Sequence, residues 1–93
     1  MTKSLLFYPS STRKVAGVMY DFHRAESDIA TFVIAFDCSL RVYSASYRHK
    51  VIPAIQPTTF IGNRIHPLTS LPFFETFEEA TAACTAKLRE LLN

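Results

Sequence analysis

The segment that most restricts the fold is Ile29–Tyr47, where two different hydrophobic patterns follow one another. Ile29–Phe36 is an almost unbroken apolar run rich in β-branched and aromatic residues, and its length suits a strand buried on both faces better than a helix. Asp37, Cys38 and Ser39 then interrupt the run with short polar side chains that favour a turn. The sequence therefore predicts a central strand, a turn and a second strand.

That second strand, Leu40–Tyr47, alternates in a way that gives its two sides different character. Arg41, Tyr43 and Tyr47 share one side, which we predict to be turned outward as a contact surface. Further basic residues lie nearby in the sequence. The predicted partner-binding residues are Arg41, Tyr43, Tyr47, Arg48, Lys50 and Arg64.

The first third of the chain also carries strand patterns. Lys3–Tyr8 is typical of a short first strand, ended by Pro9 and the serines that follow it. Lys14–His23 has apolar residues at both helical and strand spacing. We predict a strand there, because Gly17 would weaken a helix by about 1 kcal/mol and because Arg24–Asp28 has the polar composition of a hairpin connection.

A long proline-spaced connector follows Tyr47. Proline removes a backbone donor, so a central strand is excluded and only short edge strands are expected, at Lys50–Ile52 and Thr59–Ile65, with a bend at Gly62 and Asn63. Its apolar residues predict that it packs down on the core. They are Ile52, Ile55, Phe60, Ile61, Ile65 and Leu68.

The last eighteen residues predict a helix. Thr76 and Glu79 have the spacing of a capping box, in which each side chain satisfies a backbone donor of the other residue. The predicted fold is therefore α+β: an antiparallel sheet of four or five strands with one C-terminal helix packed across a face, in a single domain of residues 1–93. The helix would bury a stripe formed by Phe77, Ala80, Cys84, Leu88 and Leu91.

Composition narrows the functional classes. Hydrophobic residues make up 48% of the 93 residues, which is enough for a core, and the net charge of +2 is too small for a typical nucleic-acid binder. No stretch approaches the roughly 20 apolar residues of a membrane helix, and the first residues do not resemble a secretory signal. We therefore expect a cytoplasmic protein that does not act at a membrane, with Cys38 and Cys84 as reduced, largely buried thiols.

Catalytic and metal sites have little local support. His23, His49 and His66 lie in three separate segments without metal-ligand spacing, and both glycines are isolated, so no phosphate-binding loop is present. Cys38 could be combined with His23 and with Asp21 or Asp37 as a nucleophile, base and orienting group, but a structural cysteine and solvated aspartates explain the same residues. We predict a non-enzymatic protein without cofactor or metal.

Binding remains as the predicted role. Tyrosine and arginine on one strand suit a protein interface, and they equally suit stacking on bases with contacts to phosphate. We favour a protein partner because positive charge is sparse and because Glu75, Glu78 and Glu79 would repel a phosphate backbone. A small module that binds RNA or single-stranded nucleic acid is the alternative.

The aromatic-rich hairpin FVIAFDCSLRVYSASY and the closing helix FETFEEATAACTAKLRELLN, without an enzyme motif, resemble the short accessory proteins of phages and mobile elements. In build, the whole chain is similar to the anti-CRISPR proteins that act on type I systems. That resemblance implies an inhibitor in the host cytoplasm that occupies the nucleic-acid-binding surface of a host CRISPR ribonucleoprotein without chemistry. It transfers no site residue.

Overall fold

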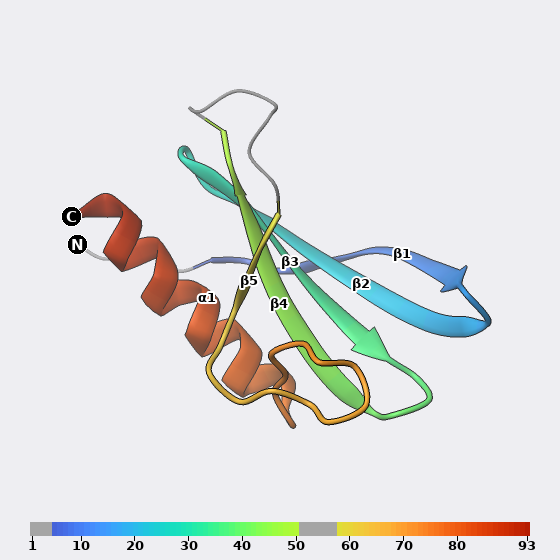
Figure 1. The fold of residues 1–93 in the computed structure, drawn as a ribbon. Coiled ribbons are helices and arrows are strands. Elements are labelled where there is room, and N and C mark those ends of the chain that lie inside the picture. The colour runs from blue at the N-terminus through green and yellow to red at the C-terminus, as the bar shows by residue number, and fades with distance from the viewer. Residues whose placement is uncertain (1–4, 51–57) are drawn as a thin grey trace.

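The apolar run that begins near Ile29 forms the middle of a five-stranded antiparallel sheet. The structure, a computed structural model, describes residues 5–50 and 58–93. The strands pair in chain order, and the one helix lies across a face of the sheet (Figure 1). The predicted α+β fold is therefore confirmed. Its elements are β1 (Tyr8–Val15), β2 (Val18–Glu26), β3 (Ala30–Asp37), β4 (Val42–His49), β5 (Thr59–Ile61) and α1 (Phe77–Leu92).

The first strand lies later in the chain than the sequence indicated. Leu5–Phe7 is not a strand, and β1 begins at Tyr8 and runs through Pro9 and the serines that we had assigned to a turn. An edge strand tolerates Pro9, because only one side of it needs backbone donors, and the register shifts between Pro9 and Ser11 as at a β-bulge. The strand predicted for Lys3–Tyr8 is therefore wrong over Leu5–Phe7, and its first two residues lie outside the described residues.

A tight hairpin joins β1 to β2 inside the ambiguous segment Lys14–His23. Ala16 and Gly17 form its two-residue loop with φ angles of 52° and 83°, the left-handed conformations that such a loop requires. The extended conformation predicted for this segment is confirmed, but the segment also contains a chain reversal. The next hairpin connection is shorter than Arg24–Asp28, since β2 continues to Glu26.

Asp37 builds the turn between β3 and β4. Its carboxylate accepts hydrogen bonds from the backbone N–H groups of Ser39 (2.8 Å) and Leu40 (2.9 Å). Arg41 follows with a φ of 59°, so the extended backbone begins only at Val42. The turn is where the sequence predicted it, but the strand start at Leu40 was two residues early.

The connector between β4 and α1 contributes only one short strand among its described residues. β5 ends at Ile61, so the predicted strand Thr59–Ile65 is too long, and Lys50–Ile52, Ile52 and Ile55 lie wholly or partly outside the described residues. Ile61 is buried, but the side chains of Ile65 and Leu68 are 52% and 75% exposed, against the expectation that they pack down.

The connector then returns to β4. Phe74 exchanges two backbone hydrogen bonds with Tyr43, of 2.7 and 2.8 Å, immediately before α1 begins. Gly62 permits this path: its φ is 127°, and a Cβ there would lie 3.1 Å from the ring of Phe74. The start of the helix is thereby fixed against the middle of the sheet.

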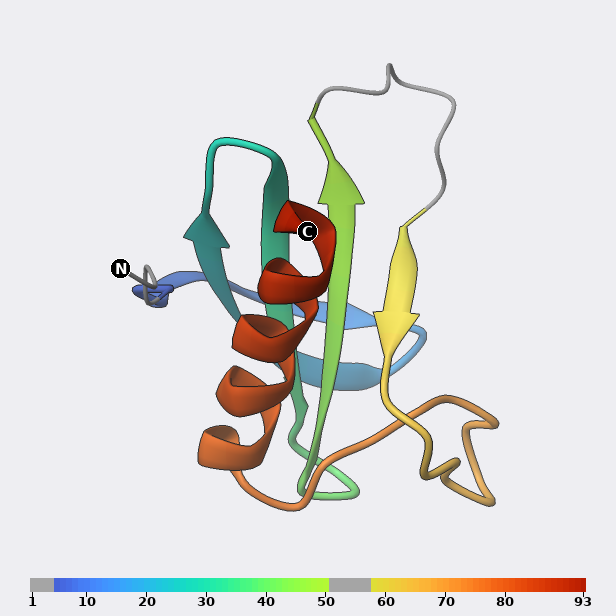
Figure 2. The same ribbon diagram turned by 90° about the vertical axis from the view of Figure 1, so that its left-hand side faces the viewer.

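The capping box of α1 is confirmed. The Glu79 N–H donates to Thr76 Oγ1, and the Thr76 N–H donates to the Glu79 carboxylate, both at 3.1 Å. The helix lies over β3, β4 and β5 and leaves the β1–β2 hairpin projecting beyond it (Figure 2). The core fills the space between them. Its buried residues are Ala25, Ala30, Phe32, Ile34, Ala45, Ile61, Ala80, Cys84 and Leu88.

The two faces of the sheet differ sharply. The helix face carries Phe32 and Ile34 of β3 and Ala45 of β4, all buried. The opposite face, here called the open face, carries neither helix nor second sheet among the described residues. Its residues on β3, Thr31, Val33 and Ala35, are only half-buried, so the central strand is not buried on both faces as predicted. From β4 the open face receives Val42, Ser44, Ser46 and Arg48.

Candidate functional site

The predicted outward side of β4 is in fact the side that lies under the helix. The ring of Tyr43 is 4.7 Å from that of Phe36 and 5.9 Å from that of Phe77, measured between ring centroids. The ring of Tyr47 lies 5.9 Å from that of Phe32. The outward orientation predicted for Tyr43 and Tyr47 is therefore wrong. Ala45, buried between them, explains why: its small side chain lets α1 approach this face.

The other predicted binding residues are dispersed. Arg41 lies in the β3–β4 turn, and Lys50 pairs with Glu26 at 2.7 Å. Arg64 lies in the connector, where it pairs with Glu75 at 3.2 Å and stacks on the ring of Phe73. Arg48 projects from the open face, and Lys50 reaches the same end of that face through its ion pair with Glu26. The structure therefore does not bring the six residues together into one patch.

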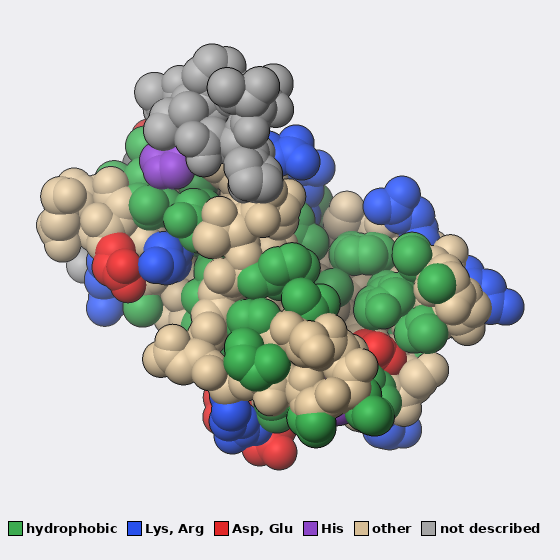
Figure 3. Space-filling model, in the orientation of Figure 1, with side chains coloured by type: hydrophobic (Ala, Val, Ile, Leu, Met, Phe, Trp, Pro, Cys, Tyr) green, Lys and Arg blue, Asp and Glu red, His purple; other side chains and the backbone are tan. Residues whose placement is uncertain are grey.

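The open face forms the larger candidate surface. Aromatic rings on it come from β2 and β5: Tyr20 and Phe22, with ring centroids 6.1 Å apart, and Phe60, which is 42% exposed. Arg13 of β1 lies over the ring of Phe22, with its guanidinium carbon 5.5 Å from the ring centroid. Figure 3 shows hydrophobic side chains gathered across the molecule and along the β1–β2 hairpin, with basic side chains at the rim.

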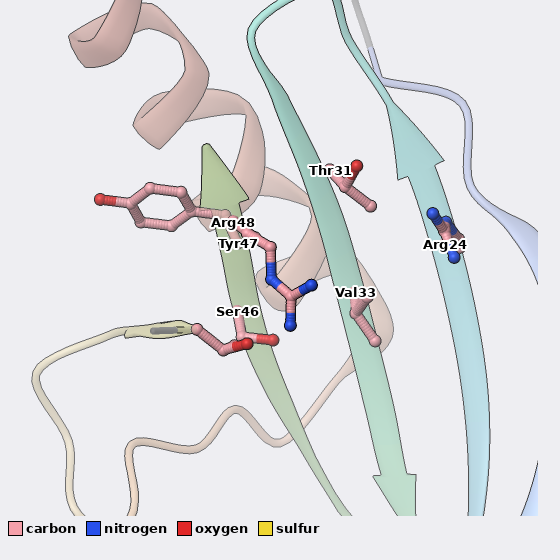
Figure 4. A pocket seen from close by; sticks show the side chains of 7 residues that line it. Arg24, Thr31, Val33, Ser46, Tyr47 and Arg48 are labelled. Atoms are coloured by element: carbon pink, nitrogen blue, oxygen red, sulfur yellow. The ribbon is translucent and has the colours of Figure 1, made fainter. Parts of the chain in front are cut away.

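A hollow of about 200 Å³, here called the arginine hollow, lies at one end of the open face. Arg24 comes from β2 and Arg48 from β4; Thr31 and Val33 of β3 lie between them, and Ser46 lies beside Arg48 on β4 (Figure 4). The ring of Tyr47 points away from these side chains. The hollow thus combines two guanidinium groups with hydroxyl groups, and its remaining lining residues are Tyr47 and Thr58.

Glu26 forms ion pairs with the basic side chains of Arg24 and Lys50 beside this hollow. Its carboxylate lies 2.6 Å from Arg24 and 2.7 Å from Lys50, and it also accepts a hydrogen bond from Thr31. The hydrogen bond from Lys50, followed by that from Arg24, lowers the pKa of Glu26 to about 2. Arg48 makes no ion pair with any residue in the described parts of the chain, so its guanidinium is available to a partner.

The connector covers the other end of the open face. A small cavity of about 40 Å³ lies where Leu71 and Pro72 pass over Tyr20, Val42 and Ser44. The packing of the connector that the sequence predicted is therefore present locally, through residues different from the exposed Ile65 and Leu68. The accessible part of the open face lies between this cover and the arginine hollow.

The residues considered for catalysis do not form an activated nucleophile. Cys38 Sγ lies 3.9 Å from an Asp21 oxygen, and local desolvation together with this carboxylate raises the pKa of the thiol. Cys38 is exposed, contrary to the prediction, whereas Cys84 is buried and burial raises its pKa to about 12. Asp37 is occupied by its turn. Within residues 5–50 and 58–93, no three metal-binding side chains lie together.

Sequence reasoning missed most of the open face. Tyr20, Phe22 and Arg24 alternate on β2, so their shared side was visible in the sequence, but we treated that segment only as strand or helix. Phe60 was assigned to the core. Small residues would not have identified the covered side either, because Ala30 and Ala45 lie under the helix while Ala35, Ser44 and Ser46 lie on the open face.

Comparison of the chain with protein-family models, with curated proteins and with solved structures finds no match. In the described part of the chain, no helix is long and apolar enough to cross a membrane.

Proposed function

We propose that this chain is a non-enzymatic binding protein that attaches to a macromolecular partner through the open face of its sheet. The observation that carries this proposal is the pair of partly exposed rings Phe22 and Phe60 on the open face, together with Arg13 over the ring of Phe22 and the exposed Arg48. Large apolar surfaces rimmed by polar groups are typical of interaction sites.

A protein surface is the preferred partner. Aromatic and arginine side chains anchor protein interfaces because they bury a large area and still make directed polar contacts. The open face also offers Val33, which is half-buried on β3, and this favours an apolar partner surface over a bare phosphate backbone. Arg48 would then meet a carboxylate at the edge of the contact.

The resemblance to anti-CRISPR proteins supports a narrower form of this proposal. The partner would be a host CRISPR ribonucleoprotein in the cytoplasm, and the chain would inhibit it by occupying its nucleic-acid-binding surface. An inhibition assay tests this directly: purified chain added to a type I surveillance complex should prevent binding of target DNA in proportion to occupancy. Unchanged DNA binding at a large excess of the chain would rule out this form.

The arginine hollow favours a second candidate, binding of single-stranded nucleic acid. A phosphate group could accept hydrogen bonds from Arg48 and from the hydroxyl of Ser46, while bases stack on Phe22 and Tyr20. This mode predicts an affinity that falls steeply with salt, because bound counterions are released. A titration of fluorescent oligonucleotides at low and moderate salt tests it, and no binding at low salt would exclude it.

Capture with matched variants tests the main proposal. The tagged chain, Phe22→Ala, Arg48→Ala and the control Arg89→Ala, which alters an exposed residue of the last turn of α1, are each used with host lysate. We expect one partner to be retained by the original chain and by the control and lost from both open-face variants. Repetition after nuclease treatment separates a protein partner from one held through nucleic acid.

The proposal fails if the folded open-face variants capture the same proteins in the same amounts as the original chain. Circular dichroism and thermal unfolding of each variant establish that loss of capture is not loss of fold.

A further inference from the structure

A second hollow lies on the helix face, on the opposite side of the sheet from the arginine hollow. It encloses about 370 Å³ beside the start of α1 and is lined by Asp21, His23, Phe36, Tyr43 and Phe77. It exists because α1 lies over β3, β4 and β5 and makes no close contact with β2, so the same face of β2 is only half-buried at Asp21 and His23. This hollow, here called the aromatic groove, plays no part in the function proposed above.

The floor of the groove is one row across three strands. Asp21 pairs with Phe36, and Phe36 pairs with Tyr43, so the carboxylate and the two rings stand side by side on the helix face. The backbone of Tyr43 is bonded on its other side to Phe74, which leads directly into α1. The floor and the first residue of the helix are therefore held in fixed relation.

The rings meet at angles that form a concave wall. Phe36 and Tyr43 are tilted by 41°, and Tyr43 meets Phe77 edge to face at 64°. His23 closes the β2 side, with its ring centroid 5.1 Å from that of Phe77. Faces of aromatic rings carry negative electrostatic potential, and several rings around one space attract an organic cation.

Asp21 adds a formal negative charge at this wall. Its carboxylate accepts a hydrogen bond from Thr12 Oγ1 at 2.8 Å and a weak one from Cys38 Sγ at 3.9 Å, both neutral donors. No basic side chain in the described residues forms an ion pair with it. A partner cation would therefore supply the missing positive charge.

The start of α1 opposes a cation, because the N-terminal end of a helix carries partial positive charge. The first turn offsets this effect. Glu78 and Glu79 stand there, and the Glu79 side chain already accepts the N–H groups of Glu75 and Thr76. Among the residues that line the groove, Asp21 is the carboxylate, and no ion pair neutralises it within the described residues.

We propose that the aromatic groove binds an alkylated ammonium group. Phe36, Tyr43 and Phe77 present their rings to its methyl groups, and Asp21 supplies the counter-charge. The ammonium group can belong to a small molecule or to a methylated lysine of a partner protein, since the recognised chemistry is the same.

Titration followed by amide NMR tests this inference with the full chain. Choline is compared with its neutral isostere, in which carbon replaces the nitrogen. We expect choline to shift the amide signals of Asp21, Phe36, Tyr43 and Phe77, and the isostere to leave them nearly unchanged. Equal shifts with both compounds, or none with choline at tens of millimolar, would overturn the proposal.

Two variants locate the binding. Asp21→Asn keeps the shape of the side chain and should weaken choline binding about three- to tenfold. Glu90→Gln removes the same charge at the far end of α1 and should leave binding unchanged. Equal affinities of Asp21→Asn and the original chain would contradict the role of this carboxylate.

A peptide with trimethyl-lysine then separates the two sources of the cation. If it binds more tightly than choline and the unmethylated peptide does not bind, a modified protein is the source. If both peptides are inert while choline binds, the source is a small molecule. Absence of partner capture by the open face would leave these results unaffected.

Discussion

The two faces of the sheet come from the same strands but differ in the burial of their side chains. On the helix face, Ala30 and Ala45 are buried to 1% exposure or less, and they leave room for a helix that inserts Ala80 and Cys84. The open face instead alternates hydroxyl, β-branched and aromatic side chains that stay partly exposed. Buried alanines lie on the face that the helix covers, whereas Ala35 and Ser44 on the open face are only half-buried, and large aromatic residues occur on both faces.

The largest expected difference between the faces concerns two phenylalanines. Phe32 is fully buried under the helix, so Phe32→Ala should lower the free energy of unfolding by about 3–5 kcal/mol. Phe22 is half-buried on the open face, so Phe22→Ala should lower the free energy of unfolding by only about 1 kcal/mol. Urea unfolding of both variants measures the contrast, and equal losses would show that the open face is part of the core.

Enlarging a small residue tests the same contrast in the opposite direction. Ala45→Leu on β4 should lower the free energy of unfolding by about 1–3 kcal/mol, because the added carbon atoms have no space beneath α1. The neighbouring change Ser44→Leu places the same side chain on the open face and should cost much less. A stable Ala45→Leu variant would mean that the helix does not pack closely there.

Loss of the N-terminal cap of α1 should have a smaller effect on stability, because it affects only the first turn of the helix. Thr76→Ala removes the acceptor for the Glu79 N–H and should reduce the free energy of unfolding by about 1 kcal/mol. Thr76→Ser keeps that hydroxyl and serves as the matched control in thermal unfolding. If the serine and alanine variants lose the same stability, the capping bond contributes little.

The smallest expected effect is the acid dependence of Glu26. Its pKa is lowered from 4.5 to about 2 in the folded protein, so the unfolded chain binds the proton first as pH falls. The stabilisation is present above about pH 4.5 and lost between there and pH 2. Because the side chain is 37% exposed, it should amount to about 1 kcal/mol or less.

Glu26→Gln provides the check in urea unfolding at several pH values. In the variant, the free energy of unfolding should no longer show the part of its decrease below about pH 4.5 that Glu26 causes, while the rest of its pH dependence remains. An unchanged profile would show that the pairs with Arg24 and Lys50 do not stabilise the fold.

Sequence patterns predicted the elements better than their orientation. The capping box at Thr76 and Glu79 and the length of the apolar run each have one local physical solution, so the helix and β3 follow from them. The start of β1 was missed, because Pro9 usually ends a strand and its tolerance at a bulged sheet edge depends on neighbours.

The prediction of the binding surface was wrong for a related reason. Alternation in Leu40–Tyr47 separates two sides but does not say which side the helix will cover. We placed the tyrosines outward because tyrosine and arginine are common at interfaces. Tertiary packing decided otherwise, since the side with Ala45 was the one that could be approached closely, and Ser44, Ser46 and Arg48 were left outside.

Hydroxyl-radical footprinting of the captured complex tests the role of the open face most directly. Binding should reduce oxidation of Tyr20, Phe22 and Phe60, while Met19, which is 41% exposed and lies on the other side of β2, should stay as reactive as in the free chain. Unchanged reactivity of the three open-face rings, together with protection along the outer side of α1, would contradict the account.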